Sequence, residues 1–95
     1  MLSQPELEQL IRKTVALYNR FRSLEAFAKI VFVSLDIVTI SFSGSLCYSC
    51  GVLDYIEDFV YEFKILTSKA ELKVERSRQT SPRSFEADYR VKYLA

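Results

Sequence analysis

The sequence predicts one α+β domain over residues 1–95, in which two helices pack on one face of a mostly antiparallel four-stranded sheet, in the order α-β-β-α-β-β. Three observations support this fold class. The 95 residues are 49% apolar and 26% charged, which suffices for one hydrophobic core. Two segments repeat apolar residues at the three- and four-residue spacing of amphipathic helices. Four segments are rich in β-branched residues or alternate apolar with polar residues, as strands do.

The first helix is predicted to begin at Ser3 and to end near Arg22. Ser3 and Glu6 have the spacing of a capping box, in which each side chain accepts a hydrogen bond from the other residue's backbone N–H. Pro5 fits the first turn, because the N–H that it lacks would have no partner there. One apolar stripe follows, formed by Leu7, Leu10, Ile11, Thr14, Leu17, Tyr18 and Phe21. Asn19 is expected on the opposite side, facing water.

A hairpin of two strands is predicted next, with a tight turn at Leu35 and Asp36. The first strand covers residues 28–34, which include β-branched and aromatic side chains. In the second strand, apolar and polar residues alternate with the period of a half-buried strand: Val38, Ile40 and Phe42 alternate with Thr39, Ser41 and Ser43. Gly44 and Ser45 end this pattern.

The second helix is predicted from Ser49 or Gly51 to about Lys64. Its apolar face holds Val52, Ile56, Phe59, Val60 and Phe63. The acidic residues Asp54, Glu57, Asp58 and Glu62 are expected on the opposite, solvent-facing side. Since perturbed catalytic acids need burial, their spacing indicates a solvated helix face rather than a paired-carboxylate active site.

The last third of the chain is predicted to form a second hairpin. Leu72 and Val74 alternate with charged residues, and after a polar turn over residues 77–83 a regular alternation runs from Phe85 to Tyr93. The sheet face away from the helices could then face water, because it would carry the polar side chains Thr39, Ser41, Lys73, Glu75, Asp88 and Arg90.

Composition argues against several classes of active site. The chain has no histidine, which removes the commonest general base and the commonest neutral metal ligand. Gly44 and Gly51 are the two glycines, too few for a glycine-rich phosphate-binding loop. A formal net charge of +1 gives no overall attraction to nucleic acid or acidic membranes. We therefore expect a binding or carrier protein rather than an enzyme.

The location is expected to be cytoplasmic. The sequence opens with a polar segment that contains a proline, instead of a basic stretch followed by an apolar one. Lys29 and Asp36 interrupt the most apolar region before the roughly 20 apolar residues of a membrane span accumulate. The two cysteines of a cytoplasmic protein are usually reduced.

The most distinctive chemical feature is the pair Cys47 and Cys50, separated by two residues. The second helix is predicted to begin beside Cys50, and a helix N-terminus stabilises a thiolate through its unpaired N–H groups and its dipole. The pair could be half of a metal or iron–sulfur site, a dithiol redox pair or a regulatory disulfide. It could also be a structural pair without further function.

A metal site built on this pair would need a second chain. Zinc and iron–sulfur sites usually have four protein ligands, and this chain supplies two cysteines and no histidine. A complete site would therefore combine Cys47 and Cys50 with the same residues of a homodimer partner, near a two-fold axis.

These motifs resemble the C-terminal domain of NifU-type iron–sulfur scaffold proteins, in which a helix and a β-hairpin lead into a glycine, a C-x-x-C pair and a second amphipathic helix. The corresponding segments here are residues 37–44, 45–50 and 52–63, with Ile56 and Glu57 in the place of a frequent Ile-Glu pair. In element order the resemblance covers residues 7–74. It implies that Cys47 and Cys50 ligate an iron–sulfur cluster shared across a homodimer, for transfer to apo-protein acceptors.

The chain departs from the pattern of that family at several positions. Ser45 and Leu46 separate Gly44 from the first cysteine, where the family has one residue. Gly51 follows the second cysteine, where a proline is common. The usual aspartate-glycine-glycine stretch before the hairpin is missing, and the last strand, residues 85–93, is additional.

Two further functions are compatible with the sequence. The segment of residues 76–83 holds Arg76, Arg78 and Arg83 among several hydroxyl side chains, a composition that can bind phosphates and would give a weak nucleic-acid binder. The remaining alternative is a protein-interaction or dimerisation module in which the cysteine pair is structural or redox-active.

Overall fold

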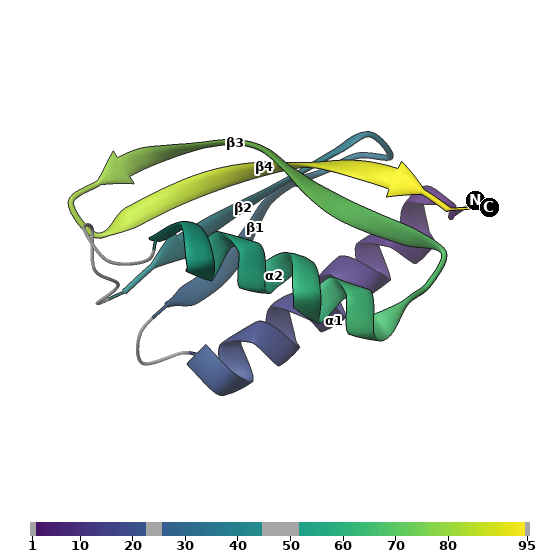
Figure 1. Ribbon diagram of the computed structural model, residues 1–95, viewed down its shortest axis with the longest axis horizontal. Coiled ribbons are helices and arrows are strands. Elements are labelled where there is room, and N and C mark those ends of the chain that lie inside the picture. Colours follow the sequence, from purple (N-terminus) through teal and green to yellow (C-terminus); the bar gives the residue numbers. More distant parts are fainter. Residues whose placement is uncertain (1, 23–25, 45–51, 95) are drawn as a thin grey trace.

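The computed structural model describes residues 2–22, 26–44 and 52–94. It contains the helices α1 (Gln4–Arg22) and α2 (Val52–Leu66) and the strands β1 (Phe27–Val33), β2 (Ile37–Ser43), β3 (Ala70–Ser81) and β4 (Ser84–Tyr93) (Figure 1). The α+β class and the order α-β-β-α-β-β predicted from the sequence are therefore confirmed.

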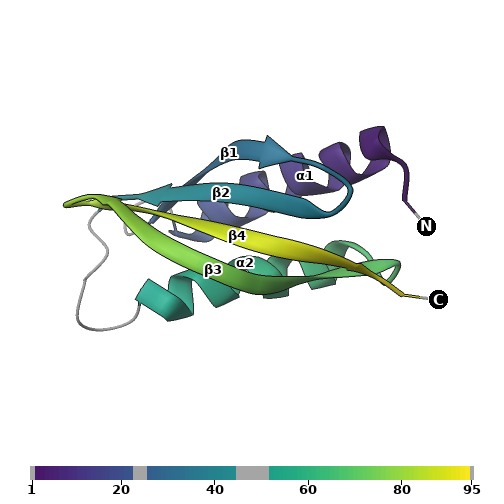
Figure 2. The same ribbon diagram turned by 90° about the horizontal axis from the view of Figure 1, so that it is seen from above.

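The four strands form one sheet in the spatial order β1-β2-β4-β3, and each neighbouring pair is antiparallel. Both helices lie on the same face of the sheet, so the molecule has two layers (Figures 1 and 2). Since β4 separates β2 from β3, the chain crosses from one to the other through α2. The outer strands β1 and β3 each keep one edge that no other described strand covers.

α1 begins with the predicted capping box. The Glu6 N–H donates to the Ser3 hydroxyl over 3.3 Å, and the Ser3 N–H donates to the Glu6 carboxylate over 3.1 Å. These hydrogen bonds hold the pKa of the Glu6 carboxyl below its ordinary value. Leu7, Ile11, Thr14 and Tyr18 are buried as predicted. The placement of Phe21 on the same buried stripe is wrong, because this residue of the last turn is 68% exposed.

The first hairpin has the predicted turn. The Ser34 N–H donates to the Ile37 carbonyl over 2.9 Å, and the Ser34 hydroxyl accepts hydrogen bonds from the N–H groups of Asp36 and Ile37. β1 begins and ends one residue earlier than predicted. It also contains a bulge at Val31, which the sequence pattern did not indicate.

The second hairpin differs from the prediction. A polar turn is predicted over residues 77–83, whereas β3 extends to Ser81 and only residues 82 and 83 connect it to β4. Both faces of β3 are exposed here, so the alternation that marks a half-buried strand is missing. Pairing with β4 holds the strand instead, for example where Arg78 lies opposite Glu86.

α2 spans the predicted region and ends two residues later than predicted. Ile56, Phe59 and Phe63 are buried against the sheet, as the spacing indicates. Within the described residues, no helix combines the length and the hydrophobicity needed to cross a membrane.

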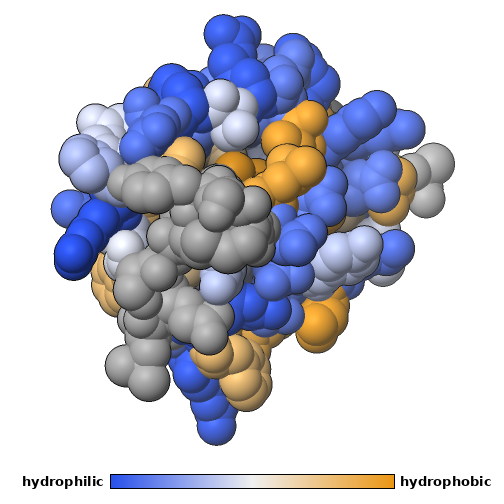
Figure 3. Space-filling view, turned by 60° about the vertical axis from the view of Figure 1, so that its left-hand side comes forward, coloured by the Kyte–Doolittle hydropathy of each residue, from blue (hydrophilic) through white to orange (hydrophobic). Residues whose placement is uncertain are grey.

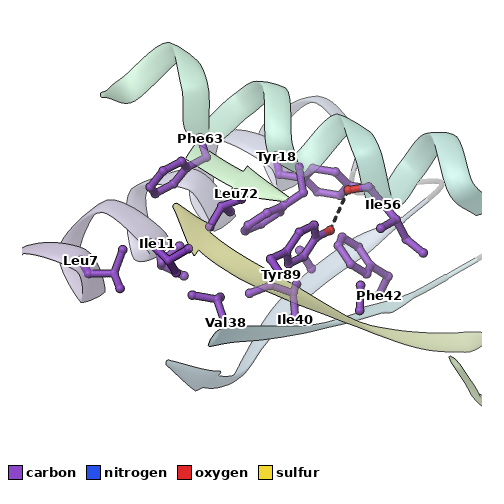
Figure 4. Packing of buried hydrophobic residues seen from close by; sticks show 14 of the residues in the cluster. Leu7, Ile11, Tyr18, Val38, Ile40, Phe42, Ile56, Phe63, Leu72 and Tyr89 are labelled. Atoms are coloured by element: carbon purple, nitrogen blue, oxygen red, sulfur yellow. Dashed lines mark hydrogen bonds between the residues drawn. The ribbon is translucent and has the colours of Figure 1, made fainter. Parts of the chain in front are cut away.

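The core lies between the sheet and the helices (Figure 4). At its centre are four aromatic side chains, each at most 1% exposed, from four different elements: Tyr18, Phe42, Phe59 and Tyr89. The ring centroids of contacting pairs are 5.4 to 5.9 Å apart. The hydroxyls of both tyrosines donate hydrogen bonds to backbone carbonyls of α2, over 3.0 Å and 2.7 Å. Burial raises the pKa of Tyr89 well above its ordinary value.

Candidate functional site

The two cysteines that the sequence singles out, Cys47 and Cys50, lie outside the described residues. Their segment follows β2 and precedes α2. At its start, Gly44 has a φ of 131°, a backbone conformation that favours glycine. The Gly44 N–H donates to the carbonyl of Arg83 over 3.2 Å. The chain therefore leaves the sheet for the cysteine segment beside the turn between β3 and β4.

No metal site is complete in the part of the chain that the structure describes. Residues 2–22, 26–44 and 52–94 contain no group of three or more His, Cys, Asp or Glu side chains placed to hold a metal ion. The surface at the end where β2 stops and α2 starts is mostly hydrophilic, with separate hydrophobic areas (Figure 3).

The three arginines predicted as a phosphate-binding loop occupy different environments. Arg76 and Arg78 lie in β3 rather than in a loop, and both form ion pairs with Asp88 of β4, at 3.6 Å and 3.0 Å. Arg78 also binds Glu86 over 2.8 Å. Only Arg83 lies in the turn, so the loop proposed from the sequence is corrected to a paired strand.

Asp88 is the centre of this charged network. It accepts hydrogen bonds from Arg78 and from the Thr39 hydroxyl, the latter over 2.7 Å. The hydrogen bond from Arg78 holds the pKa of the Asp88 carboxyl below its ordinary value. In this network the carboxylates of Glu86 and Asp88 balance the charges of Arg76 and Arg78. This face is therefore a neutral ion-pair network rather than the basic patch that phosphate binding requires.

A second ion-pair cluster joins the two helices. The Arg22 guanidinium donates to Asp58 over 3.2 Å and to Glu62 over 3.0 Å, and it lies 4.8 Å from the centre of the Tyr18 ring. The predicted exposure of Glu62 is wrong, because this contact leaves the residue only 7% exposed. Partial burial opposes the charge of Arg22, but the hydrogen bond to Glu62 and the charge of Asp58 raise its pKa above the ordinary value. The cluster therefore links α1 to α2.

Side chains of α1 cap two positions on the outer edge of β1, Ala28 and Val33. Asn19, expected to face water, instead accepts a hydrogen bond from the Ala28 N–H over 2.7 Å and donates to the Ala28 carbonyl over 3.0 Å. Gln4 donates to the Val33 carbonyl over 2.9 Å. The Asn19 amide thus replaces a neighbouring strand at this position. Together with the bulge at Val31, these contacts protect β1 from pairing with another strand.

We expect the substitution Asn19→Ala to destabilise the protein by about 1–3 kcal/mol and to speed hydrogen exchange at the Ala28 amide, because both backbone groups of Ala28 lose their partner. Urea unfolding and amide exchange measure the two effects. Asn19→Asp is the matched control: its carboxylate still accepts from the Ala28 N–H but repels the carbonyl, so exchange at this amide should stay slower than in Asn19→Ala even though stability falls. Unchanged exchange at Ala28 in Asn19→Ala would contradict the covered edge.

The outer edge of β3 is open in its first half. The Val91 N–H of β4 donates to the Asp36 carbonyl on the β2 side, so the backbone groups of Val91 point away from β3. Leu72 lies opposite Val91, and Val74 lies opposite Tyr89. Because bonded and non-bonded pairs alternate in an antiparallel ladder, the N–H and C=O groups of Leu72 and Val74 point outward. In contrast to β1, no described side chain caps them.

This open edge of β3 and α2 enclose a groove of about 380 Å³. Its apolar lining consists of Val60, Leu72 and Val74, and Tyr61 beside them is 61% exposed. Four charged residues complete the lining, Glu57 and Lys64 from α2 and Glu71 and Lys73 from β3. None of these four forms an ion pair within the described residues, whereas the charges of Arg78, Arg90 and their partners on the same sheet are paired.

The sequence alone did not indicate this groove. The sequence pattern assigned Glu57 to a solvated helix face and Lys64 only to the end of the second helix. The available signal was the placement of one acid and one base on either side of an apolar residue in β3, Glu71-Leu72-Lys73. That signal gains meaning only once β3 is known to be an outer strand. No protein-family model, curated protein or solved structure matches this chain.

Proposed function

We propose that this chain is a small non-catalytic protein-interaction module that binds an extended strand along the outer edge of β3. The observation that carries the proposal is the difference between the two outer strands. Side chains of α1 satisfy the outward backbone groups of Ala28 in β1, whereas no side chain of the described residues caps the outward groups of Leu72 and Val74 in β3. An uncapped edge offers main-chain hydrogen bonds to a strand that is added to the sheet.

The groove between α2 and β3 would select among strands. Side chains alternate across an extended strand, so every second side chain of the bound segment would point towards α2. There it would contact Val60 and Tyr61, which favours apolar residues at alternate positions. The main chain would supply affinity and the groove selectivity.

A titration followed by NMR tests this function. The probe is a seven-residue synthetic peptide of alternating valine and threonine, and the control has proline at every second position, which removes the N–H groups that bind the edge. We expect shifts of the amide signals in residues 57–64 and 70–74 with the first peptide and none with the second. Equal shifts with both peptides, or shifts in β1 alone, would rule out strand addition at β3.

A second candidate function is a metal or iron–sulfur carrier, for which we propose Cys47 and Cys50 as ligands shared across a homodimer. The observation in its favour is the position of the segment between the end of β2 and the start of α2. Two thiolates per chain suit zinc or an iron–sulfur cluster, and a second chain would complete four ligands. A cluster held in this way would be cargo for apo-protein acceptors.

The carrier function is tested by an absorption spectrum with iron, zinc and thiol quantitation on protein purified without oxygen. A brown protein that loses its colour in Cys47→Ser, but keeps it in Ser49→Ala, would support a cluster. A colourless protein with one zinc per dimer would support a shared metal site instead. Protein that stays metal-free after reconstitution would reject the carrier and leave the cysteines as a redox or structural pair.

A further inference from the structure

We propose that the strand bound at the outer edge of β3 is β3 of a second copy of this chain. The two copies pair antiparallel about a two-fold axis at Leu72 and join their sheets into one continuous sheet. This inference rests on the proposed function, because it names the partner of the same edge and groove. The protein would then be a homodimer whose contact is formed by residues of β3 and α2.

The backbone of β3 fits this pairing. Across a two-fold axis at Leu72, the N–H and C=O groups of Leu72 exchange hydrogen bonds with the partner's Leu72. Ala70 of each copy lies opposite the partner's Val74, and these residues have the same outward orientation as Leu72. The bulge between Val74 and Arg76 ends the regular stretch on one side, so the pairing is short and its register is defined.

The charges of β3 are self-complementary about this axis. Glu71 and Lys73 flank Leu72, so the two-fold operation places each Glu71 opposite the partner's Lys73. Oppositely charged side chains in directly opposing positions stabilise a strand pair. Within its own chain, Lys73 lies opposite Arg90, which has the same charge. The second copy therefore supplies Lys73 with the acid that its own sheet does not.

The exposed surface of α2 has the same symmetry. Glu57 and Lys64 are seven residues apart, which places them two turns apart on the side of α2 that lines the groove. A two-fold axis at the groove runs the partner's α2 antiparallel, so the acid of one helix faces the base of the other. Tyr61 and Ile65, which are 61% and 71% exposed in the single chain, lie on the same stretch and would be covered.

In a contact with two-fold symmetry, every pair of facing residues occurs twice. A second copy of this chain therefore forms both the Glu71–Lys73 pair and the Glu57–Lys64 pair two times, by symmetry alone. The two edges of the sheet also explain why assembly would stop at two chains. Asn19 and Gln4 cap backbone groups of Ala28 and Val33 in β1, so the outer edges of a dimer formed through β3 are partly capped, which opposes growth into a fibre.

This dimer separates the cysteine segments. The start of each segment, Gly44, lies beside Arg83 at the end of the molecule that β3 reaches nine residues after Leu72. At about 3.3 Å per residue, the two Gly44 residues would be roughly 60 Å apart. A cluster shared between Cys47 and Cys50 of two chains would therefore need a different contact, and the two arrangements are distinguishable.

Sedimentation equilibrium with charge variants tests the pairing. We expect the wild type to dimerise, and Glu71→Lys or Lys73→Glu to raise the dimer dissociation constant about tenfold or more, because each creates two like-charge pairs across the axis. The double variant Glu71→Lys/Lys73→Glu restores opposite charges and should return to within about threefold of the wild type. Lys13→Glu, on the exposed side of α1, is the matched control and should change nothing.

Circular dichroism establishes that each variant is folded before it is compared. A protein that stays monomeric at every concentration, a dimer insensitive to both single reversals, or a double variant as weak as the single ones would overturn the proposed dimer. A synthetic peptide of residues 69–75 separates this failure from that of the proposed function. If the monomer binds that peptide at β3 but does not self-associate, the proposed strand-binding edge stands and the proposed dimer fails. If it neither binds the peptide nor self-associates, both proposals fail.

Discussion

The substitution Phe59→Ala is expected to lower the free energy of unfolding by about 3–5 kcal/mol. The Phe59 ring is fully buried, and its centroid lies 5.8 Å from that of Tyr18, 5.9 Å from that of Phe42 and 5.4 Å from that of Tyr89. Removing it leaves a cavity between both helices and two central strands, which cannot all move inward together. Urea unfolding followed by circular dichroism measures the change.

Phe32→Ala is the matched control for this prediction. Phe32 has the same side chain but is 54% exposed on β1. A substitution there should change the free energy of unfolding by about 1 kcal/mol or less, since little surface leaves an apolar environment. Similar losses in both variants would contradict the assignment of Phe59 to the centre of the core.

The second large effect is expected at the cluster that joins the helices. Arg22→Gln should destabilise the protein by about 2–3 kcal/mol, because it leaves the nearly buried Glu62 carboxylate without its cation. Adding Glu62→Gln to this variant removes the unpaired charge and should recover part of the loss. Urea unfolding of the single and double variants measures both steps.

Arg90→Gln is the control, because Arg90 also forms an ion pair, at 2.6 Å with Glu75, but its side chain is 58% exposed. Exposed pairs of this kind contribute about 0–1 kcal/mol. If Arg22→Gln were no more destabilising than Arg90→Gln, or if Glu62→Gln deepened its effect, the Arg22 cluster would not be the link between α1 and α2.

Local signals in the sequence were sufficient for most of the fold. The Ser3 and Glu6 capping box marked the start of α1, and the alternation from Phe85 to Tyr93 marked β4. These signals act between residues that are close in the chain or repeat with a regular period, so they can be recognised in one sequence. The end of β3 was missed because its last residues are polar on both faces and are held by partners in β4.

The candidate site was much less predictable, because it depends on contacts between distant segments. The sequence does not show that Asn19 caps Ala28, that Arg22 pairs with Glu62, or that β3 is an outer strand. The side chains of Asn19 and Glu62 look like ordinary solvated residues until the elements around them are placed. The cysteine pair stood out because C-x-x-C is a local motif, and its function stays a prediction.

Amide hydrogen exchange of Leu72 and Val74, followed at increasing protein concentration, is the most direct test of β3 as the interaction edge. The outward N–H groups of both residues should exchange fast in dilute protein and slowly once a second strand covers the edge. The Ala28 amide, which is bound to Asn19, should exchange slowly at every concentration. If Leu72 and Val74 exchange fast at all concentrations and also in the presence of the peptide of residues 69–75, the edge of β3 is not an interaction surface.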